Sequence, residues 1–154
     1  NFQFVLAGTN PQDPAYEQKI KSQIDNSSLR SHTSITGFVT GELKSSLLQA
    51  ADLFVLPSYY ENFGIAVAEA MVAETPVVIS DQVHICQQVH ESQSGWVTTT
   101  DVLALTESLR TALQNPAECQ RRGLNAKDHA LHNYSWDAIA RQTIQAYKQI
   151  LVSS

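Results

Sequence analysis

Short apolar runs alternate along the chain with longer stretches in which apolar residues recur at helical spacing. Apolar runs bounded by Gly, Pro, Ser or Asp are typical of strands buried on both faces of a parallel sheet. They predict strands at 2–7, 34–38, 53–56, 77–80 and 96–98. The longer stretches predict helices at 14–29, 43–51, 64–73, 85–89, 102–114, 117–132 and 136–151.

Strands that alternate with helices indicate an α/β fold, because a parallel strand needs a crossover connection to return to the same edge. We therefore expect a Rossmann-like parallel sheet flanked by helices. A chain of 154 residues has the usual size of one domain, so residues 1–154 are expected to form a single domain. The chain starts at Asn1, directly before an apolar strand, and is expected to be excised from a longer protein.

The most informative stretch lies between the strand at 53–56 and the helix at 64–73, where Glu61 and Glu69 flank a Phe-Gly step. A strand, a turn and a helix in this order place the turn at the carboxyl edge of the sheet, where open α/β folds bind ligands. Gly64 lets the backbone approach a ligand, and the free N–H groups of the first helical turn favour a phosphate. Because carboxylates accept hydrogen bonds from diols, the pattern suits a nucleotide sugar.

Each of these residues also has a plainer interpretation. On the motif alone, Glu61 and Glu69 would be solvated carboxylates of a surface helix, since short motifs recur by chance. Phe63 would be a core aromatic that anchors the turn while its backbone faces the ligand. Tyr59 and Tyr60 would be packing or rim residues.

Further motifs occur in a specific order around the two glutamates. The chain carries Phe4-Val5-Leu6-Ala7-Gly8, Gly37-Phe38-Val39, Ala-Asp-Leu-Phe-Val-Leu-Pro-Ser at 51–58, the Glu61 and Glu69 pair, Thr-Pro-Val-Val at 75–78, Ser80-Asp81, and Ser94-Gly95-Trp96-Val97. This series resembles the donor half of retaining glycosyltransferases of the family 4, or group 1, type, which have the two-domain GT-B fold. The resemblance covers nearly the whole chain, which would then be the C-terminal half of such a fold.

The resemblance implies a role for each matching residue. Glu61, the catalytic residue of this set, would hold hydroxyls of the donor sugar, and Glu69 would accept hydrogen bonds from the ribose. The backbone of Asn62, Phe63, Gly64 and Ile65 would line the sugar and pyrophosphate. Gly8 would face the diphosphate, and the main chain of Phe38 and Val39 would read the base.

The resemblance also implies partners and limits. The donor would be a UDP-, GDP- or ADP-linked sugar, no metal or other cofactor is expected, and the protein's own N-terminal domain would hold the acceptor. The Arg and Lys that offset leaving-group charge in the family are expected outside this chain. The isolated fragment should be inactive, because the acceptor side of the cleft belongs to the missing domain. Two departures stand out. Glu74 occupies a position where the family usually has Gly, and Gln82-Val83-His84 replaces small residues, either to select a different sugar or to pack differently.

Composition excludes other classes. A net charge of −5 argues against nucleic-acid binding, which needs clustered Lys and Arg. No apolar run approaches the length of a membrane span, so a cytoplasmic location is expected, with the inner face of the membrane as an alternative reached through the missing domain. Cys86 and Cys119 make no disulfide framework, and His84 with Cys86 lacks a second pair of metal ligands.

Two other classes of function fit these residues less well than a transferase. A non-catalytic GT-B-like binding or scaffold module would have no reason to keep both Glu61 and Glu69. A dinucleotide-binding dehydrogenase requires a Gly-x-Gly-x-x-Gly turn, which Gly8-Thr9-Asn10-Pro11 does not supply. The identity of the base, sugar and acceptor lies beyond what these motifs specify.

Overall fold

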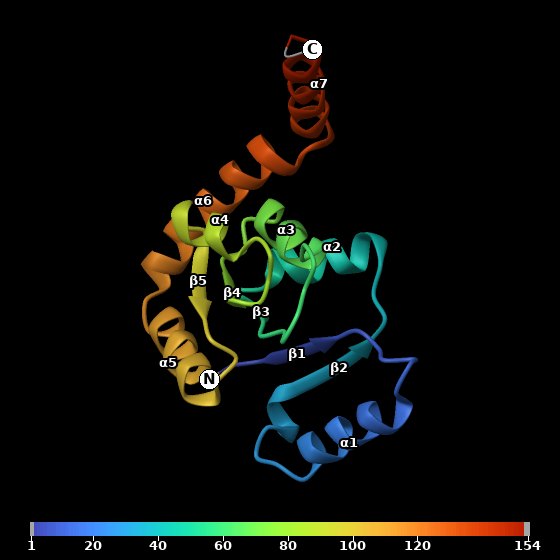
Figure 1. Cartoon of the computed structure of the whole chain (residues 1–154). Helices are drawn as coiled ribbons and strands as arrows, with labels where there is room; N and C mark the ends of the chain where they lie inside the picture. Colours follow the sequence, from blue (N-terminus) through green and yellow to red (C-terminus); the bar gives the residue numbers. More distant parts are fainter. Residues whose placement is uncertain (1, 153–154) are drawn as a thin grey trace. The chain divides into compact units, whose positions relative to one another are not determined.

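The computed structural model describes residues 2–152, which form two compact units that divide between Lys44 and Ser45 (Figure 1). Each unit contains parallel strands and helices in alternation, so the predicted α/β class is confirmed. The strands form two parallel sheets rather than the single expected sheet. The single domain expected over residues 1–154 stays a prediction.

The first unit is a strand, a crossover helix and a second strand. Its elements are β1 (Phe4–Ala7), α1 (Pro14–Asp25), the 3-10 turn Arg30–His32 and β2 (Thr33–Gly37). β1 pairs in parallel with β2, with Phe4 opposite Thr33. The helix begins where the Asp13 carboxylate accepts a hydrogen bond from the Tyr16 N–H, a normal N-cap arrangement.

Helix α1 is shorter than the pattern predicts, since it ends at Asp25 and not at Leu29. The Asn26 side-chain amide and the Asn26 N–H both donate to the carbonyl of Ser22. Asn competes in this way with the continuing helix, because its short side chain can satisfy nearby backbone groups.

The second unit contains the remaining elements, and α2 crosses the division between the units. The elements are α2 (Gly41–Ala50), β3 (Phe54–Leu56), α3 (Ile65–Val72), β4 (Val77–Ser80), α4 (Cys86–Glu91), β5 (Gly95–Thr98), α5 (Val102–Leu113), α6 (Pro116–Tyr134) and α7 (Trp136–Val152). All strands of this unit are parallel in the order β3-β4-β5, with Val78 opposite both Val55 and Trp96. Each predicted element is present within a few residues.

The core of the second unit is centred on β4, all four of whose residues are buried. Its apolar partners come from α3, from the segment that leads into α4, and from α6. The buried cluster comprises Val67, Ala70, Met71, Val77, Ile79, Val83, Ile85, Val89, Ala126 and Ala130. A strand covered on both faces explains why the sequence there is continuously apolar and does not alternate.

Helix α6 also contacts β5 through charged side chains. The Arg122 guanidinium lies over the Trp96 ring, 4.5 Å from its centroid, and donates to the carbonyl of Gly95. Glu118 accepts hydrogen bonds from Arg121 and Arg122, which hold the pKa of its carboxyl at about 2. Helix α6 therefore packs against the strand at the edge of this sheet.

Helix α7 follows α6 at the C-terminal end of the chain and contacts it (Figure 1). Much of its apolar surface is exposed. Trp136, Ile144, Tyr147 and Leu151 are all exposed. Even so, no helix within residues 2–152 is both long enough and apolar enough to cross a membrane.

Helices α3 and α6 approach closely where α3 ends. Glu74 follows that helix with a φ of 68°, the left-handed conformation expected at a position where Gly is usual. A Cβ added to Gly123 of α6 would lie 2.3 Å from the Glu74 carbonyl oxygen, which is closer than real side chains come. The Lys127 ammonium pairs with the Glu74 carboxylate at 3.0 Å, so the turn is held from the same helix.

Replacing Gly123 with Ala should destabilise the chain, because the clash is with backbone and cannot be relieved by a rotamer change. Overpacking of this kind costs about 1–3 kcal/mol. Urea unfolding followed by circular dichroism measures the loss in unfolding free energy. The control is Gln120→Ala, an exposed position on the same helix, which should change stability by less than about 0.5 kcal/mol. Equal stability in the two variants would contradict the close contact.

Candidate functional site

The turn between β3 and α3 carries the predicted motif. Gly64 is the residue that precedes α3, and its φ of 87° lies in the left-handed region. A Cβ on Gly64 would meet Val67 at 3.1 Å and Val83 at 3.2 Å. The position therefore requires glycine both for conformation and for space. The expected approach of a ligand to this backbone stays a prediction.

Glu61 is held against the loop that follows β4. The Glu61 N–H donates to the Gln82 carbonyl at 3.2 Å, and the His84 N–H donates to the Glu61 carbonyl at 3.1 Å. These two bonds form a parallel bridge between Glu61 and Val83. The Glu61 carboxylate also accepts from the Gly64 N–H at 3.3 Å, which places it at the start of α3, where a negative charge is favoured.

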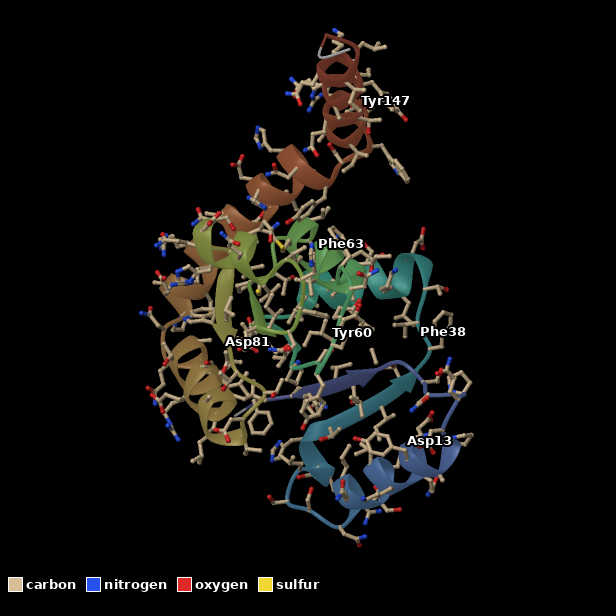
Figure 2. All side chains as sticks on the ribbon, in the orientation of Figure 1. Asp13, Phe38, Tyr60, Phe63, Asp81 and Tyr147 are labelled. Atoms are coloured by element: carbon tan, nitrogen blue, oxygen red, sulfur yellow. The ribbon has the colours of Figure 1, made fainter. Side chains whose placement is uncertain are left out.

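The carboxyl end of β4 is tied to both neighbouring strands. The buried Ser80 hydroxyl donates to the Ser58 carbonyl at 2.5 Å, just beyond β3. The Asp81 N–H donates to the Thr98 carbonyl at 2.8 Å, at the end of β5. The turn that carries Glu61 and the loop that carries Asp81 are thus fixed at one edge of the sheet, and the β5 ribbon ends near the labelled Asp81 (Figure 2).

A cavity of about 320 Å³ lies between this turn and this loop. Its lining residues are Tyr60, Glu61, Asn62, Asp81, Gln82, Val83, His84 and Cys86. The position agrees with the edge where α/β sheets bind ligands. The lining is polar and includes two carboxylates, an arrangement able to accept several hydrogen bonds from a ligand rich in hydroxyls.

Of the other predicted site residues of this unit, Asn62 lines the cavity, whereas Phe63, Gly64, Ile65 and Glu69 are not among its lining residues. Glu69 is partly buried on α3, and Ile65 is 69% exposed at the start of that helix. The Phe63 ring packs edge-on against Tyr134 of α6, with centroids 5.4 Å apart. Phe63 is 38% exposed, so it contacts α6 from the surface and is not the core aromatic that was expected. Burial raises the pKa of Tyr134 and lowers that of its neighbour His129.

The predicted residues of the first unit follow its two strands. Gly8 comes after β1 with a φ of 126°, and its N–H donates to the Gly37 carbonyl at 2.8 Å. Phe38 and Val39 follow β2, and the Phe38 side chain is 76% exposed. Their roles toward a diphosphate and a base stay predictions.

Sequence reasoning did not assign Asp81 to the site, and it treated His84 and Cys86 as structural or exposed. All three line the cavity. The available signal was an Asp directly after a buried strand that neighbours the motif strand. Within residues 2–152, no group of three or more His, Cys, Asp or Glu side chains is placed to hold a metal ion.

Comparison with known proteins assigns the family. Residues 1–129 match the family described as Glycosyl transferases group 1. The chain belongs to this family. An uncharacterized glycosyltransferase of Methanocaldococcus jannaschii is 36% identical over 113 residues, which cover 73% of this chain and 29% of that protein. This group 1 chain therefore spans less than a third of the length of that relative.

Solved structures agree with this group 1 assignment. Sucrose-phosphate synthase from Thermosynechococcus elongatus matches with a TM-score of 0.83 and 30% identity, covering 99% of this chain and 39% of that chain. HepE from Anabaena, solved in complex with UDP, matches with a TM-score of 0.84 and 22% identity, covering 96% of this chain and 41% of that one. The predicted GT-B glycosyltransferase fold is confirmed.

Replacing Gly64 with Ala should destabilise the turn, because the left-handed conformation costs an L-residue roughly 1–2 kcal/mol and the Cβ crowds two valines. The loss should appear in the free energy of unfolding, measured by urea denaturation followed by circular dichroism. Ala66→Gly tests the opposite exchange on exposed α3 surface and should cost no more than about 1 kcal/mol. A Gly64→Ala variant whose free energy of unfolding equals that of the parent chain would contradict the described turn.

Proposed function

We propose that this chain is the donor-binding half of a retaining glycosyltransferase and binds a sugar linked to a nucleoside diphosphate. The observation that carries the proposal is the placement of Glu61, which is bridged to the β4–α4 loop and lines a polar cavity at the carboxyl edge of the sheet. The family assignment supports a transferase, and the UDP bound to Anabaena HepE supports a nucleoside diphosphate as ligand.

In the proposed mechanism, Glu61 accepts hydrogen bonds from hydroxyls of the donor sugar. Glu69, on the second turn of α3, accepts from the ribose 2′- and 3′-hydroxyls. The backbone of 62–65 leads into the N-terminus of α3, whose N–H groups suit the pyrophosphate. These contacts position the donor, and positioning both reactants for attack supplies much of the rate enhancement in such transfers.

The remaining parts of the reaction belong to the proposal as well. The acceptor and the basic residues that offset leaving-group charge would come from another domain of a longer protein. The transfer would proceed without a metal ion in this half, and the protein would act in the cytoplasm.

Substitution of Glu61 and of Glu69 should affect nucleoside diphosphate affinity differently. Glu69→Gln should weaken binding of free UDP, GDP or ADP, whichever binds best, by roughly tenfold or more, because hydrogen bonds to charged groups are worth about 1.5–3 kcal/mol. Glu61→Gln should leave this affinity nearly unchanged, since its partner is the sugar. Isothermal calorimetry on this chain gives the affinities.

Glu107→Gln is the matched control, since Glu107 is an exposed carboxylate on α5 whose loss should not change nucleotide affinity. Equal losses in the Glu61 and Glu69 variants, with folding intact by circular dichroism, would refute the separate roles. No binding of any of the three nucleoside diphosphates at millimolar concentration would refute the proposed donor site.

The chain of residues 1–154 should bind nucleotide yet transfer no sugar, because the acceptor would be held elsewhere. Incubation of the purified chain with radiolabelled nucleotide sugar and a panel of sugar acceptors measures transfer. Turnover above the background of a Glu61→Gln sample would contradict the division of donor and acceptor between two domains.

A further inference from the structure

The loop between β4 and α4, which is bridged to Glu61, supplies Asp81, Gln82, Val83 and His84 to the lining of the cavity. We propose that the cavity wall selects the donor sugar by charge, so that the site takes a neutral or amino hexose and rejects a uronic acid. The proposal rests on the proposed function, because it places the donor sugar next to Glu61. Asp81 is the residue that would determine this specificity.

The side chains of the cavity wall carry acceptors and negative charge. The carboxylates of Glu61 and Asp81 are its two acidic groups, and Gln82, Asn62 and Tyr60 add neutral polar groups. His84 is the one basic side chain among the lining residues, and Val83 and Cys86 complete the lining. The lining residues include no Lys or Arg. A carboxylate on a ligand is commonly bound by Arg in a bidentate pair, and this wall offers no such partner.

Asp81 is held in place from two sides. Its backbone N–H donates to the Thr98 carbonyl at 2.8 Å, and the Gln82 side-chain amide donates to its Oδ1 at 2.9 Å. A carboxylate has about four lone-pair positions, so one bond from Gln82 leaves capacity for sugar hydroxyls. The position of the loop relative to Glu61 is set by the backbone bridge between Glu61 and Val83.

This arrangement gives neutral and acidic sugars opposite outcomes. A hexose with only hydroxyls can donate to both carboxylates, and an amino group could do so with added charge attraction. A uronic acid has a carboxylate where the hexose has a hydroxyl group. The ionised carboxylate donates no hydrogen bond, and the carboxylates of Glu61 and Asp81 repel it. The same loop contains Gln82-Val83-His84, the segment for which selection of a sugar and plain packing were both open.

The test compares UDP, UDP-glucose and UDP-glucuronate binding to the chain of residues 1–154 by calorimetry. The measurements are made at pH 8, which lies at the upper end of the usual titration range of histidine, about pH 5 to 8. Low salt is used because salt screens the charge interactions under test. If GDP is the preferred base, GDP, GDP-mannose and GDP-mannuronate take the same places; if ADP is preferred, ADP, ADP-glucose and ADP-glucuronate do. UDP-glucuronate should bind at least tenfold more weakly than UDP-glucose. Equal affinities for the two sugars would overturn the proposal.

Two variants assign the discrimination to the wall. Asp81→Asn keeps the shape of the side chain and the oxygen that accepts from Gln82. It should reduce the ratio of UDP-glucose affinity to UDP-glucuronate affinity at least threefold, while the affinity for UDP stays unchanged. Gln82→Glu adds a negative charge to the same wall and should increase this affinity ratio. The control Glu107→Gln on α5 should leave the affinity ratio unaltered.

The outcomes separate this proposal from the one on which it rests. Binding of UDP with no penalty for glucuronate, or with a penalty that neither loop variant changes, would overturn the charge selection and leave the donor site standing. Failure of UDP, GDP and ADP to bind at all would overturn both. A variant whose circular dichroism differs from that of the parent chain is replaced by the other loop variant, and either one decides the question.

Discussion

The second unit depends on strand β4 and on the bonds that leave its carboxyl end. The strand is buried on both faces and paired on both edges, so its position is fixed by packing and by backbone hydrogen bonds together. Ser80, its last residue, bonds to the turn after β3, and Asp81, the residue that follows, bonds to the end of β5. The polar residues that follow are therefore presented at a defined edge, although they lie on a loop.

Residues with positive φ angles flank helix α3 at both ends, Gly64 before it and Glu74 after it. Glycine adopts such an angle readily because it has no Cβ, whereas Glu74 adopts a conformation that is costly for its residue type. Its ion pair with Lys127 offsets part of this cost, and Gly123 leaves room for its carbonyl.

Much of the fold could be predicted because its signals are local. The continuous apolar run of β4 and the Gly-Trp-Val of β5 mark strands by composition and flanking residues alone. The end of α1 was misjudged because a single Asn side chain competed with the helix. In the site, Glu61 and Gly64 were identified from the order of the motifs, whereas Asp81 was missed, since an Asp after a strand is common and its neighbours in space were unknown.

The sequence by itself determined the alternation of strands and helices, the family and the turn that carries Glu61, because these depend on residues close together in the chain. The tertiary structure alone decided that the β4–α4 loop lies against Glu61, that Glu69 lies outside the cavity wall and that the strands form two sheets. Apolar patterning shows that a strand is buried but not which strand pairs with it. That choice is made when distant segments pack and satisfy each other's backbone groups.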